Sequence, residues 1–183
     1  MRWPRLFTRS RHEMRHLEGL IEIFLQPGDL FVANADYQIR TILGSCVSIT
    51  LWHPATRMGG MSHFLLPTRG LASTGQGLDG RYGDEALLQM IHELKQVGVT
   101  PSQCQAKIFG GGNMFPEHRS QGTVHVGQRN GDAARALLQE HDIPVVSESL
   151  FGVGHRQIIF NVSNGDVWAN QVRPTHSSLE VKP

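Results

Sequence analysis

Short apolar runs of β-strand type alternate with turn residues from Ile21 onward. Runs of four to seven residues that are rich in β-branched or aromatic side chains and bounded by Gly, Pro, Asn or Asp are typical of strands. Because several such runs follow one another closely, we expect a sheet rich in meander connections in this part of the chain. The predicted strands cover residues 21–25, 30–33, 38–42, 47–52 and 60–66.

Two later stretches have helical periodicity. Apolar residues recur at 3.6-residue spacing from Ala86 to Val97, and Gly98 ends the pattern. Asp84 and Glu85 stand near the start of this helix, where negative charge suits the helix dipole. The other predicted elements are a helix over 132–141, strands over 106–109, 145–147, 157–162 and 167–169, and a hairpin turn at Asn164-Gly165 between the last two strands.

The length of 183 residues fits one compact domain. Apolar residues make up 39% of the chain, which is enough for a packed core. Residues 1–19 hold five Arg against two Glu, although the whole chain has a net charge of only +1. We therefore expect a basic flexible arm over 1–19, a folded domain over 20–170 and a tail over 171–183.

Charge and hydropathy argue against a nucleic-acid-binding protein and against membrane insertion. A net charge near zero cannot hold a polyanion by electrostatics alone. The longest apolar stretches are far shorter than the roughly 18 residues that cross a bilayer. Two Cys residues do not form the dense disulfide framework of small secreted domains, and no signal-peptide pattern precedes them. We expect a cytoplasmic protein with reduced thiols.

The segment His12-Glu13-Met14-Arg15-His16 spells the zincin motif H-E-x-x-H. In that motif two His residues one helical turn apart bind zinc and the Glu acts as a base. The motif requires a helix with a buried face, whereas this segment lies in the Arg-rich arm with almost no apolar support. A zinc metalloprotease is therefore a remote alternative, and we expect no metal.

The run Gly110-Gly111-Gly112-Asn113 follows a predicted strand, as a phosphate-binding loop does. Such a loop, however, leads directly into a helix and usually ends in Lys, Ser or Thr. Here Met114-Phe115-Pro116 follows. We interpret the glycines as a tight turn, or as backbone brought close to an active site.

Cys46 stands where a Gly-containing turn enters an apolar strand, a place in which Cys is most often a small core residue. The strand that ends at His63 would pair antiparallel with the strand after Cys46, and this pairing brings the two residues within reach. The imidazole can take the thiol proton, stabilise the thiolate as an ion pair and return the proton to a leaving amine. Cys104 has no His close in sequence, and we treat it as incidental.

Five ordered segments together resemble the CheD family of bacterial chemotaxis proteins. The resemblance runs from about Gly28 to Asp166, which is most of the chain. The segments are LGSCV at 43–47, GMSHFLLP at 60–67, YGD at 82–84, KIFGGGNM at 107–114 and SLFGVGHR at 149–156.

The resemblance implies a chemoreceptor glutamine deamidase, a protein-glutamine glutaminase that converts receptor Gln to Glu and releases ammonia without a cofactor. Cys46 would be the nucleophile and His63 the general base. Family members also use a Thr shortly before the Cys; Thr41 is the nearest Thr, although an ungapped alignment places Arg40 there. The implied fold is α+β, a mixed β-sandwich flanked by two or three helices and similar to the catalytic fold of the cytotoxic necrotizing factor toxins.

The implied substrates are chemoreceptors, the methyl-accepting chemotaxis proteins. A different class of function is also open, a non-catalytic partner that regulates a CheC-type phosphatase. For the deamidase, backbone N–H groups of Gly44, Ser45 and Cys46 would stabilise the oxyanion. The glycine-rich loop over 67–80 would border the groove that receives a receptor helix. The substrate side of the site would be lined by Ser62, Gly111, Gly112 and Asn113.

Overall fold

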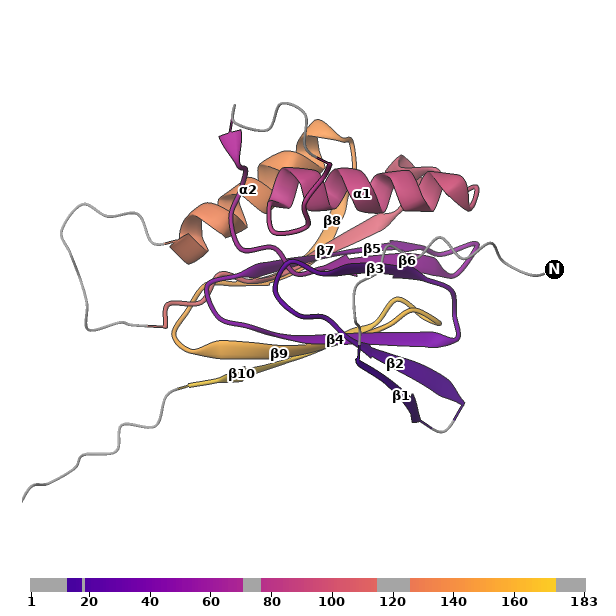
Figure 1. Cartoon of the computed structure of the whole chain (residues 1–183), viewed down its shortest axis with the longest axis horizontal. Coiled ribbons are helices and arrows are strands. Elements are labelled where there is room, and N and C mark those ends of the chain that lie inside the picture. Colours follow the sequence, from indigo (N-terminus) through magenta and orange to yellow (C-terminus); the bar gives the residue numbers. More distant parts are fainter. Residues whose placement is uncertain (1–12, 18, 71–76, 115–125, 174–183) are drawn as a thin grey trace, which may run out of the picture.

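Helices and two sheets form three layers in the computed structural model of the chain, which describes residues 13–17, 19–70, 77–114 and 126–173 (Figure 1). Helices α1 (Gly83–Gln96) and α2 (Val126–Glu140) form one layer, and a short 3-10 turn (Pro101–Gln103) follows α1. One sheet lies beneath the helices, and the second sheet packs on its far side. This α+β arrangement of a sheet core flanked by helices confirms the predicted fold class.

The middle layer, which we name the covered sheet, is buried on both faces in its central strands. Its strands are β3 (Leu30–Ala33), β5 (Val47–His53), β6 (Met58–Ser62), β7 (Gln105–Gly110) and β8 (Val145–Leu150). They lie in the order β3-β6-β5-β7-β8, and all pairs are antiparallel except β7 with β8. Burial on both faces explains why β5 carries few exposed polar positions.

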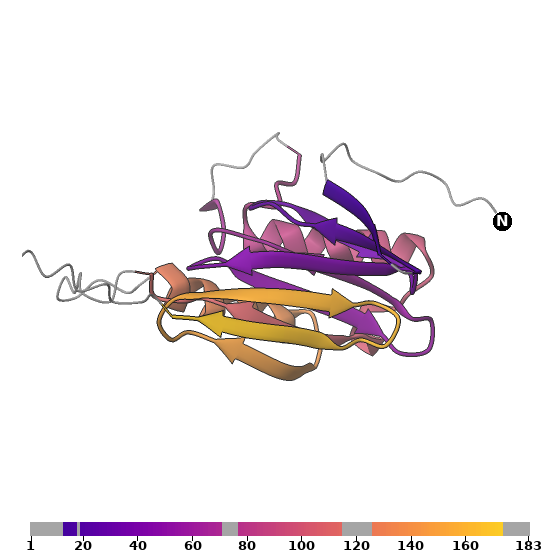
Figure 2. The same cartoon turned by 90° about the horizontal axis from the view of Figure 1, so that it is seen from below.

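The second layer, which we name the outer sheet, packs one face on the covered sheet. Its strands are β1 (Glu13–Leu17), β2 (Leu20–Phe24), β4 (Tyr37–Leu43), β9 (His155–Asn161) and β10 (Val167–Val172), in the order β1-β2-β4-β9-β10. Only β2 and β4 are parallel within this described sheet. Neither α1 nor α2 covers the other face, which Figure 2 shows from below and on which Ile42 and Trp168 are exposed.

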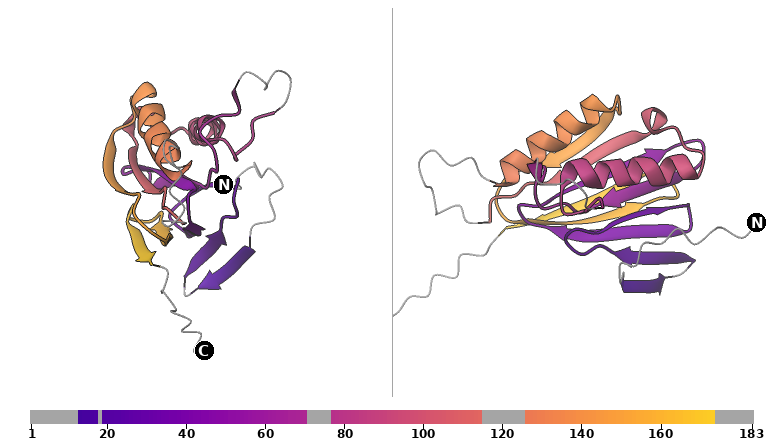
Figure 3. Two further views of the ribbon diagram at one scale, coloured as in Figure 1. Left: turned by 90° about the vertical axis from the view of Figure 1, so that its left-hand side faces the viewer. Right: turned by 45° about the horizontal axis from the view of Figure 1, so that its top comes forward.

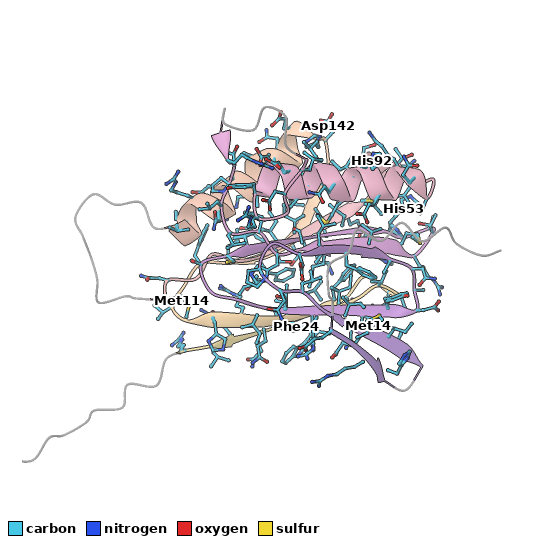
Figure 4. All side chains as sticks on the ribbon, in the orientation of Figure 1. Met14, Phe24, His53, His92, Met114 and Asp142 are labelled. Atoms are coloured by element: carbon cyan, nitrogen blue, oxygen red, sulfur yellow. The ribbon has the colours of Figure 1, made fainter. Side chains whose placement is uncertain are left out.

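Two hydrophobic cores hold the layers together. Leu87 and Met90 of α1 share one buried cluster with Ile49 of β5, and both helices lie across the same face of the covered sheet (Figure 3, right). Between the sheets, Phe160 of the outer sheet and Met61 of the covered sheet belong to a second cluster. Side chains fill the space between the layers in Figure 4. Each fully buried side chain of this size stabilises the fold by about 1.5–3 kcal/mol, so both layer contacts contribute.

The first helix and most predicted strands are found at their expected places, but the strand predicted over 60–66 is β6 and ends at Ser62, and the predicted meander between residues 21 and 66 is wrong. Of the strands in that region, only β5 and β6 form a hairpin, because the chain passes from β2 to β3, then to β4 and β5, by crossing each time between the two sheets. Apolar periodicity identifies a strand and its buried face, but it does not identify the neighbouring strand.

Several element boundaries also differ from the predicted ones, among them that of β8, which continues to Leu150 rather than ending at residue 147. Glu13–Leu17, assigned to the arm, forms β1 and pairs antiparallel with β2, while residues 1–12 lie outside the described part of the chain. Strand β10 continues to Val172 within the predicted tail. Helix α2 starts at Val126 rather than at residue 132. In the described residues, no helix has the length and apolarity that crossing a membrane requires.

Candidate active site

The turn that holds Cys46 carries the chain from the outer sheet to the covered sheet. Strand β4 ends before Gly44, Ser45 and Cys46, and β5 begins directly after them. Cys46 is half-buried and packs against the core between the sheets. An ideal Cβ on Gly44 would lie 3.1 Å from the side chain of Met114, which Figure 4 shows at the left-hand end of the layers. The turn therefore lies at that end of the molecule.

Cys46 and His63 lie on the same face of the covered sheet. The pairing of β5 with β6 ends in a bridge between Val47 and Phe64, whose backbone groups exchange hydrogen bonds of 3.1 and 3.0 Å. In this register Cys46 is opposite Leu65, and His63, two residues earlier, projects from the same face as Leu65. His63 is therefore the diagonal neighbour of Cys46 across the strand pair, a separation that long side chains can bridge.

Thr41 reaches His63 from the opposite sheet. Its hydroxyl lies 2.7 Å from His63 Nδ1 and donates a 2.8 Å hydrogen bond to the carbonyl oxygen of Leu25. A hydroxyl has one hydrogen and a carbonyl only accepts, so Thr41 Oγ1 accepts from the ring N–H at Nδ1. Neutral His63 then leaves Nε2 unprotonated, which is the tautomer that a general base requires.

Burial keeps the Cys–His pair uncharged at rest. Loss of hydration lowers the pKa of His63 from its ordinary 6.5 to about 4, and a hydrogen bond with the Leu25 carbonyl opposes this shift only in part. Burial also raises the pKa of the Cys46 thiol, against the smaller opposing effect of its own backbone N–H. These shifts argue against the preformed ion pair that the sequence suggested, and a base at His63 would take the thiol proton only as the thiol attacks.

Each carbonyl group of the turn accepts a hydrogen bond from the segment after β7 or from α2. Because the C=O and N–H of one trans peptide point in opposite directions, fixing the carbonyls also fixes the N–H groups of the turn. The three bonds run from Gly112 N to Gly44 O (2.8 Å), from Asn130 Nδ2 to Ser45 O (3.0 Å) and from Gly111 N to Cys46 O (2.9 Å).

Glycine at the end of β7 allows this close approach. Gly110 has a φ of 114°, and a Cβ on it would lie 2.3 Å from the carbonyl oxygen of Cys46. A Cβ on Gly112 would lie 2.3 Å from the carbonyl oxygen of Gly154. Gly110 therefore brings the backbone at the end of β7 against the turn that carries Cys46, which fits the interpretation of these glycines as backbone close to a candidate active site.

A pocket of about 260 Å³ opens beside the turn. Gly111, whose N–H donates to Cys46 O, forms one side of it. Phe151 forms another side of the pocket. Its φ of 65° is strained for a residue with a bulky side chain, and backbone strain of this kind is often found at functional sites. The lining residues are Gly111, Asn113, Gln128, Phe151, Gly152 and Val153.

Ser62 does not lie on the substrate side where the resemblance placed it. Its side chain is fully buried, and its Oγ accepts a 3.4 Å hydrogen bond from the backbone N–H of Ile49. Neighbouring residues of a strand project to opposite faces, so Ser62 faces the helices while His63 faces the outer sheet. This residue belongs to the packing of the covered sheet.

Two buried polar residues near the turn were missed in the sequence. Asn130 of α2 is fully buried and donates to Leu65 O (2.8 Å) as well as to Ser45 O. Arg156 of β9 is buried and donates to the carbonyl oxygens of Gly110 (3.0 Å) and Phe151 (2.5 Å). Arg156 was visible as the last residue of the SLFGVGHR segment, whereas Asn130 stands in a polar stretch that resembles a loop.

The zincin alternative conflicts with the local structure. Of the motif residues, Glu13 and His16 lie in strand β1 and are exposed, whereas the motif requires a helix, and His12 lies outside the described residues. No group of three or more potential metal ligands occurs within the described ranges. Cys104 is fully buried, and burial raises the pKa of its thiol to about 11, which fits an unreactive core residue.

The two ends of the glycine-rich loop are held against α1. Arg69 forms a bidentate ion pair with Glu85, and the backbone N–H of Asp79 donates to the same carboxylate at 2.7 Å. The backbone N–H of Leu65, two residues after His63, donates to Arg81 O at 2.9 Å. The loop thus starts and ends beside the strand end that carries His63, while residues 71–76 lie outside the described part of the chain.

Comparison with known proteins identifies related chains. A family model described as CheD chemotactic sensory transduction matches residues 65–171, more than half of the chain. The matched stretch begins just after Cys46 and His63, so the assignment of these two residues depends on their geometry.

Curated relatives match a longer part of the chain. A protein of Albidiferax ferrireducens named probable chemoreceptor glutamine deamidase CheD 2 is 70% identical over 84% of this chain and 89% of its own length. Proteins named probable chemoreceptor glutamine deamidase CheD from Pseudomonas savastanoi and Pseudomonas syringae are 45% and 41% identical. They cover 82% and 92% of this chain, and 84% and 96% of their own lengths.

Proposed function

This chain belongs to the CheD family, and from that premise we propose that it deamidates glutamine side chains of chemoreceptors to glutamate, with release of ammonia. The observation that carries the mechanism is the hydrogen bond between Thr41 and His63 beside Cys46. With this bond, His63 is a neutral imidazole whose Nε2 is unprotonated, and it projects from the face of the sheet that also carries the Cys46 thiol. This is the arrangement with which a Cys nucleophile is activated by a general base.

The first half of the reaction forms a thioester. Nε2 of His63 takes the thiol proton while Cys46 Sγ attacks the amide carbon of the substrate glutamine, which gives a tetrahedral oxyanion. Backbone N–H groups of the turn, Ser45 and Cys46 among them, stabilise this oxyanion. The imidazolium then donates its Nε2 proton to the amide nitrogen, the C–N bond breaks, and ammonia leaves.

The second half of the reaction returns the enzyme to its resting state. His63 takes a proton from a water molecule as the water oxygen attacks the thioester carbon. The C–S bond breaks, the imidazolium proton passes to the Cys46 sulfur, and the carboxylic acid product loses its remaining proton to water and leaves as a glutamate side chain. During both halves Thr41 keeps Nδ1 protonated and the ring in one orientation, so the same nitrogen handles every proton.

Substrate recognition involves more than the reacting side chain, because the glutamine lies on a helix of a large receptor. The pocket formed by Gly111, Asn113 and Phe151 lies beside the Cys46 turn, and the ends of the glycine-rich loop lie beside His63. We place the receptor helix between these two features. Deleting loop residues 71–76 should slow deamidation of an intact receptor much more than deamidation of a short glutamine peptide.

The test of the catalytic assignment compares Cys46→Ala, His63→Ala and Cys104→Ala with the unchanged protein. Receptors incubated with each protein are analysed by mass spectrometry for the one-dalton gain of a deamidated glutamine. We expect the gain with the unchanged protein and Cys104→Ala, and neither gain nor ammonia with the other two. Unfolding midpoints identify any variant that fails only because it is unfolded. Deamidation by folded Cys46→Ala would refute the nucleophile assignment.

Two further expectations accompany the proposal. Both Cys46 and Cys104 are free thiols, which suits the cytoplasm, where the signalling part of a receptor is accessible.

Binding to a CheC-type phosphatase would add a regulatory role to the same protein. Titration of the phosphatase with Cys46→Ala separates the two roles: binding without deamidation supports a dual role, and no binding removes the regulatory one.

A further inference from the structure

We infer that Asn130 is a positioning residue, which holds the peptide between Ser45 and Cys46 so that its N–H faces the oxyanion of the reaction. The inference rests on the proposed function, because the oxyanion forms only if Cys46 attacks an amide. It assigns a role to a helix residue that lies outside the Cys–His–Thr group and that touches no reacting atom.

The amide of Asn130 uses both of its N–H groups on the site. They donate to Ser45 O at 3.0 Å and to Leu65 O at 2.8 Å, and the side chain is fully buried. Since both partners are carbonyl oxygens, which only accept, the nitrogen of the amide must face them. Its Oδ1 has no hydrogen-bond partner in the described part of the chain, so this side chain contributes only its donors and leaves a buried acceptor unpaired.

The bond to Ser45 controls the N–H of Cys46. Ser45 O and Cys46 N belong to one planar trans peptide, in which the two groups point in opposite directions. Holding the carbonyl towards α2 therefore directs the Cys46 N–H away from α2. The same N–H lowers the pKa of its own thiol, so it acts on the sulfur that attacks the amide, next to the carbon on which the oxyanion forms.

The bond to Leu65 fixes the distance between the nucleophile and the base. The ladder between β5 and β6 ends at Val47 and Phe64, so no strand hydrogen bond joins the turn to the residues after His63. Just beyond the end of this ladder, Asn130 joins the two segments of the chain by bonding to both Ser45 O and Leu65 O. Loss of this bridge frees both segments at the point where Cys46 and His63 must keep their separation.

Helix α2 is shaped to bring Asn130 to this position. A Cβ on Gly127 would lie 2.4 Å from Gly111 O, and a Cβ on Gly131 would lie 2.6 Å from the ring of Phe151. Two glycines and an Asn inside a helix each reduce its stability, by up to about 1 kcal/mol for each glycine. Local choices that weaken an element are expected at functional sites, and here they let α2 contact the segment that binds Cys46 O.

The first experiment measures steady-state deamidation of a glutamine peptide by Asn130→Asp and Asn130→Ala. The aspartate keeps the shape of the side chain but has no donors. We expect kcat to fall about tenfold to a hundredfold, less than the loss of an oxyanion donor itself, while KM changes less than threefold. Leu138→Ala, which opens the core under the same helix, is the control and should keep its kcat below its unfolding temperature.

The second experiment measures the pH dependence of Cys46 alkylation by iodoacetamide in a Cys104→Ala background. Its readout is independent of deamidation. We expect the midpoint to move to higher pH in Asn130→Ala, because the Cys46 N–H no longer favours the thiolate, and to stay unchanged in Leu138→Ala. If an Asn130 variant does not fold, Asn130→Ser, which cannot bridge both carbonyls, replaces it in both experiments.

The outcomes separate the inference from the proposed function. Active Cys46→Ala would overturn the proposed function, and the alkylation profile would still test the placement of the N–H. An inactive Cys46→Ala together with an Asn130→Asp that has the unchanged kcat would overturn the inference alone. So would equal losses of kcat in Asn130→Asp and Leu138→Ala, since these would indicate a purely structural role.

Discussion

The orientation of one imidazole ring depends on a single hydroxyl. Thr41 Oγ1 donates to Leu25 O and accepts from Nδ1 of His63, so the proton of the neutral ring is fixed on the nitrogen that faces Thr41. The resemblance made Thr41 the third polar group of the site, although an ungapped alignment places Arg40 there. Contact with His63 favours Thr41, since the Arg40 side chain pairs with Glu22 and lies over the ring of Phe24 instead.

Replacing Thr41 with Val should lower kcat for a glutamine peptide by about tenfold to a hundredfold, a part of the gain that general base catalysis provides. Valine keeps the volume of the side chain but leaves Nδ1 without its acceptor, so the other tautomer becomes accessible. Thr41→Ser should restore most of the rate. Thr50→Val, at a buried threonine of β5 in the covered sheet, is the control and should have the unchanged kcat.

Burial of neutral His63 should make the protein less stable in mild acid. The pKa of His63 is about 4 in the folded protein and 6.5 when unfolded, so between these values only the unfolded chain binds the proton. The free energy of unfolding therefore keeps its full value, as far as His63 is concerned, above pH 6.5. It decreases as the pH falls from 6.5 towards 4. The contribution of His63 amounts to about 3 kcal/mol at its largest.

Denaturant unfolding at several pH values tests this loss in the unchanged protein and in His63→Gln. Carboxylates titrate in the same range, but they contribute to both curves, so the difference between the curves isolates His63. We expect the difference to shrink as the pH falls from 6.5 to 4. Parallel curves over that range would contradict the burial of a neutral imidazole.

At the scale of elements, the sequence predicted what periodicity controls and failed where a tertiary contact decides. The helix over Gly83–Gln96 was predicted within a few residues, because its buried face repeats at 3.6 residues. The start of α2 was predicted too late, because Gly127, Asn130 and Gly131 weaken a helix. These residues are the ones that contact the Cys46 turn and its neighbours, so packing at the site compensates for their poor propensity.

The end of β7 offers a prediction of the same kind. Gly110→Ala should destabilise the fold and abolish activity, because the new Cβ meets Cys46 O at 2.3 Å in addition to the strain of a φ of 114°. Gly98→Ala is the matched control, since Gly98 also has a positive φ, of 80°, but open space around it. The control should lose about 1–2 kcal/mol from strain alone and keep its activity.

Chemical denaturation and peptide deamidation measure both effects. We expect Gly110→Ala to lose ~1–3 kcal/mol more than the control, the usual cost of overpacking. Equal stability of the two variants would show that there is room for a Cβ between Gly110 and the turn that carries Cys46.

At the scale of the whole molecule, the site exists because two sheets face each other. The hairpin of β5 and β6 let the sequence predict that Cys46 and His63 are neighbours across the strand pair, and the register places them diagonally on one face. Thr41 and Leu25 belong to the other sheet, and their contact with His63 depends on how the sheets stack. Asn130 arrives from the third layer. Contacts between layers leave no periodic signal in the chain, so the sequence alone could assign Thr41 only through the resemblance and could not assign Asn130.

The position of β1 predicts where the folded domain begins. Removal of residues 1–12 takes away four Arg and changes the net charge from +1 to −3, and it leaves in place every core side chain that the described residues provide. Activity on a glutamine peptide and the unfolding midpoint should therefore stay unchanged. Removal of residues 1–19 also deletes β1 and leaves β2 as an unpaired edge next to β4.

Thermal unfolding of both truncated proteins distinguishes an arm from a strand that supports the sheet. We expect the longer truncation to lower the midpoint by several degrees, since about 1 kcal/mol shifts the midpoint of a domain of this size by 2–4 °C, and to promote self-association through the exposed edge of β2. The site lies across the sheets at Thr41, one strand further in, so peptide activity below the midpoint should persist. Identical midpoints for the two truncations would mean that β1 contributes nothing to the fold and that the arm extends to residue 19.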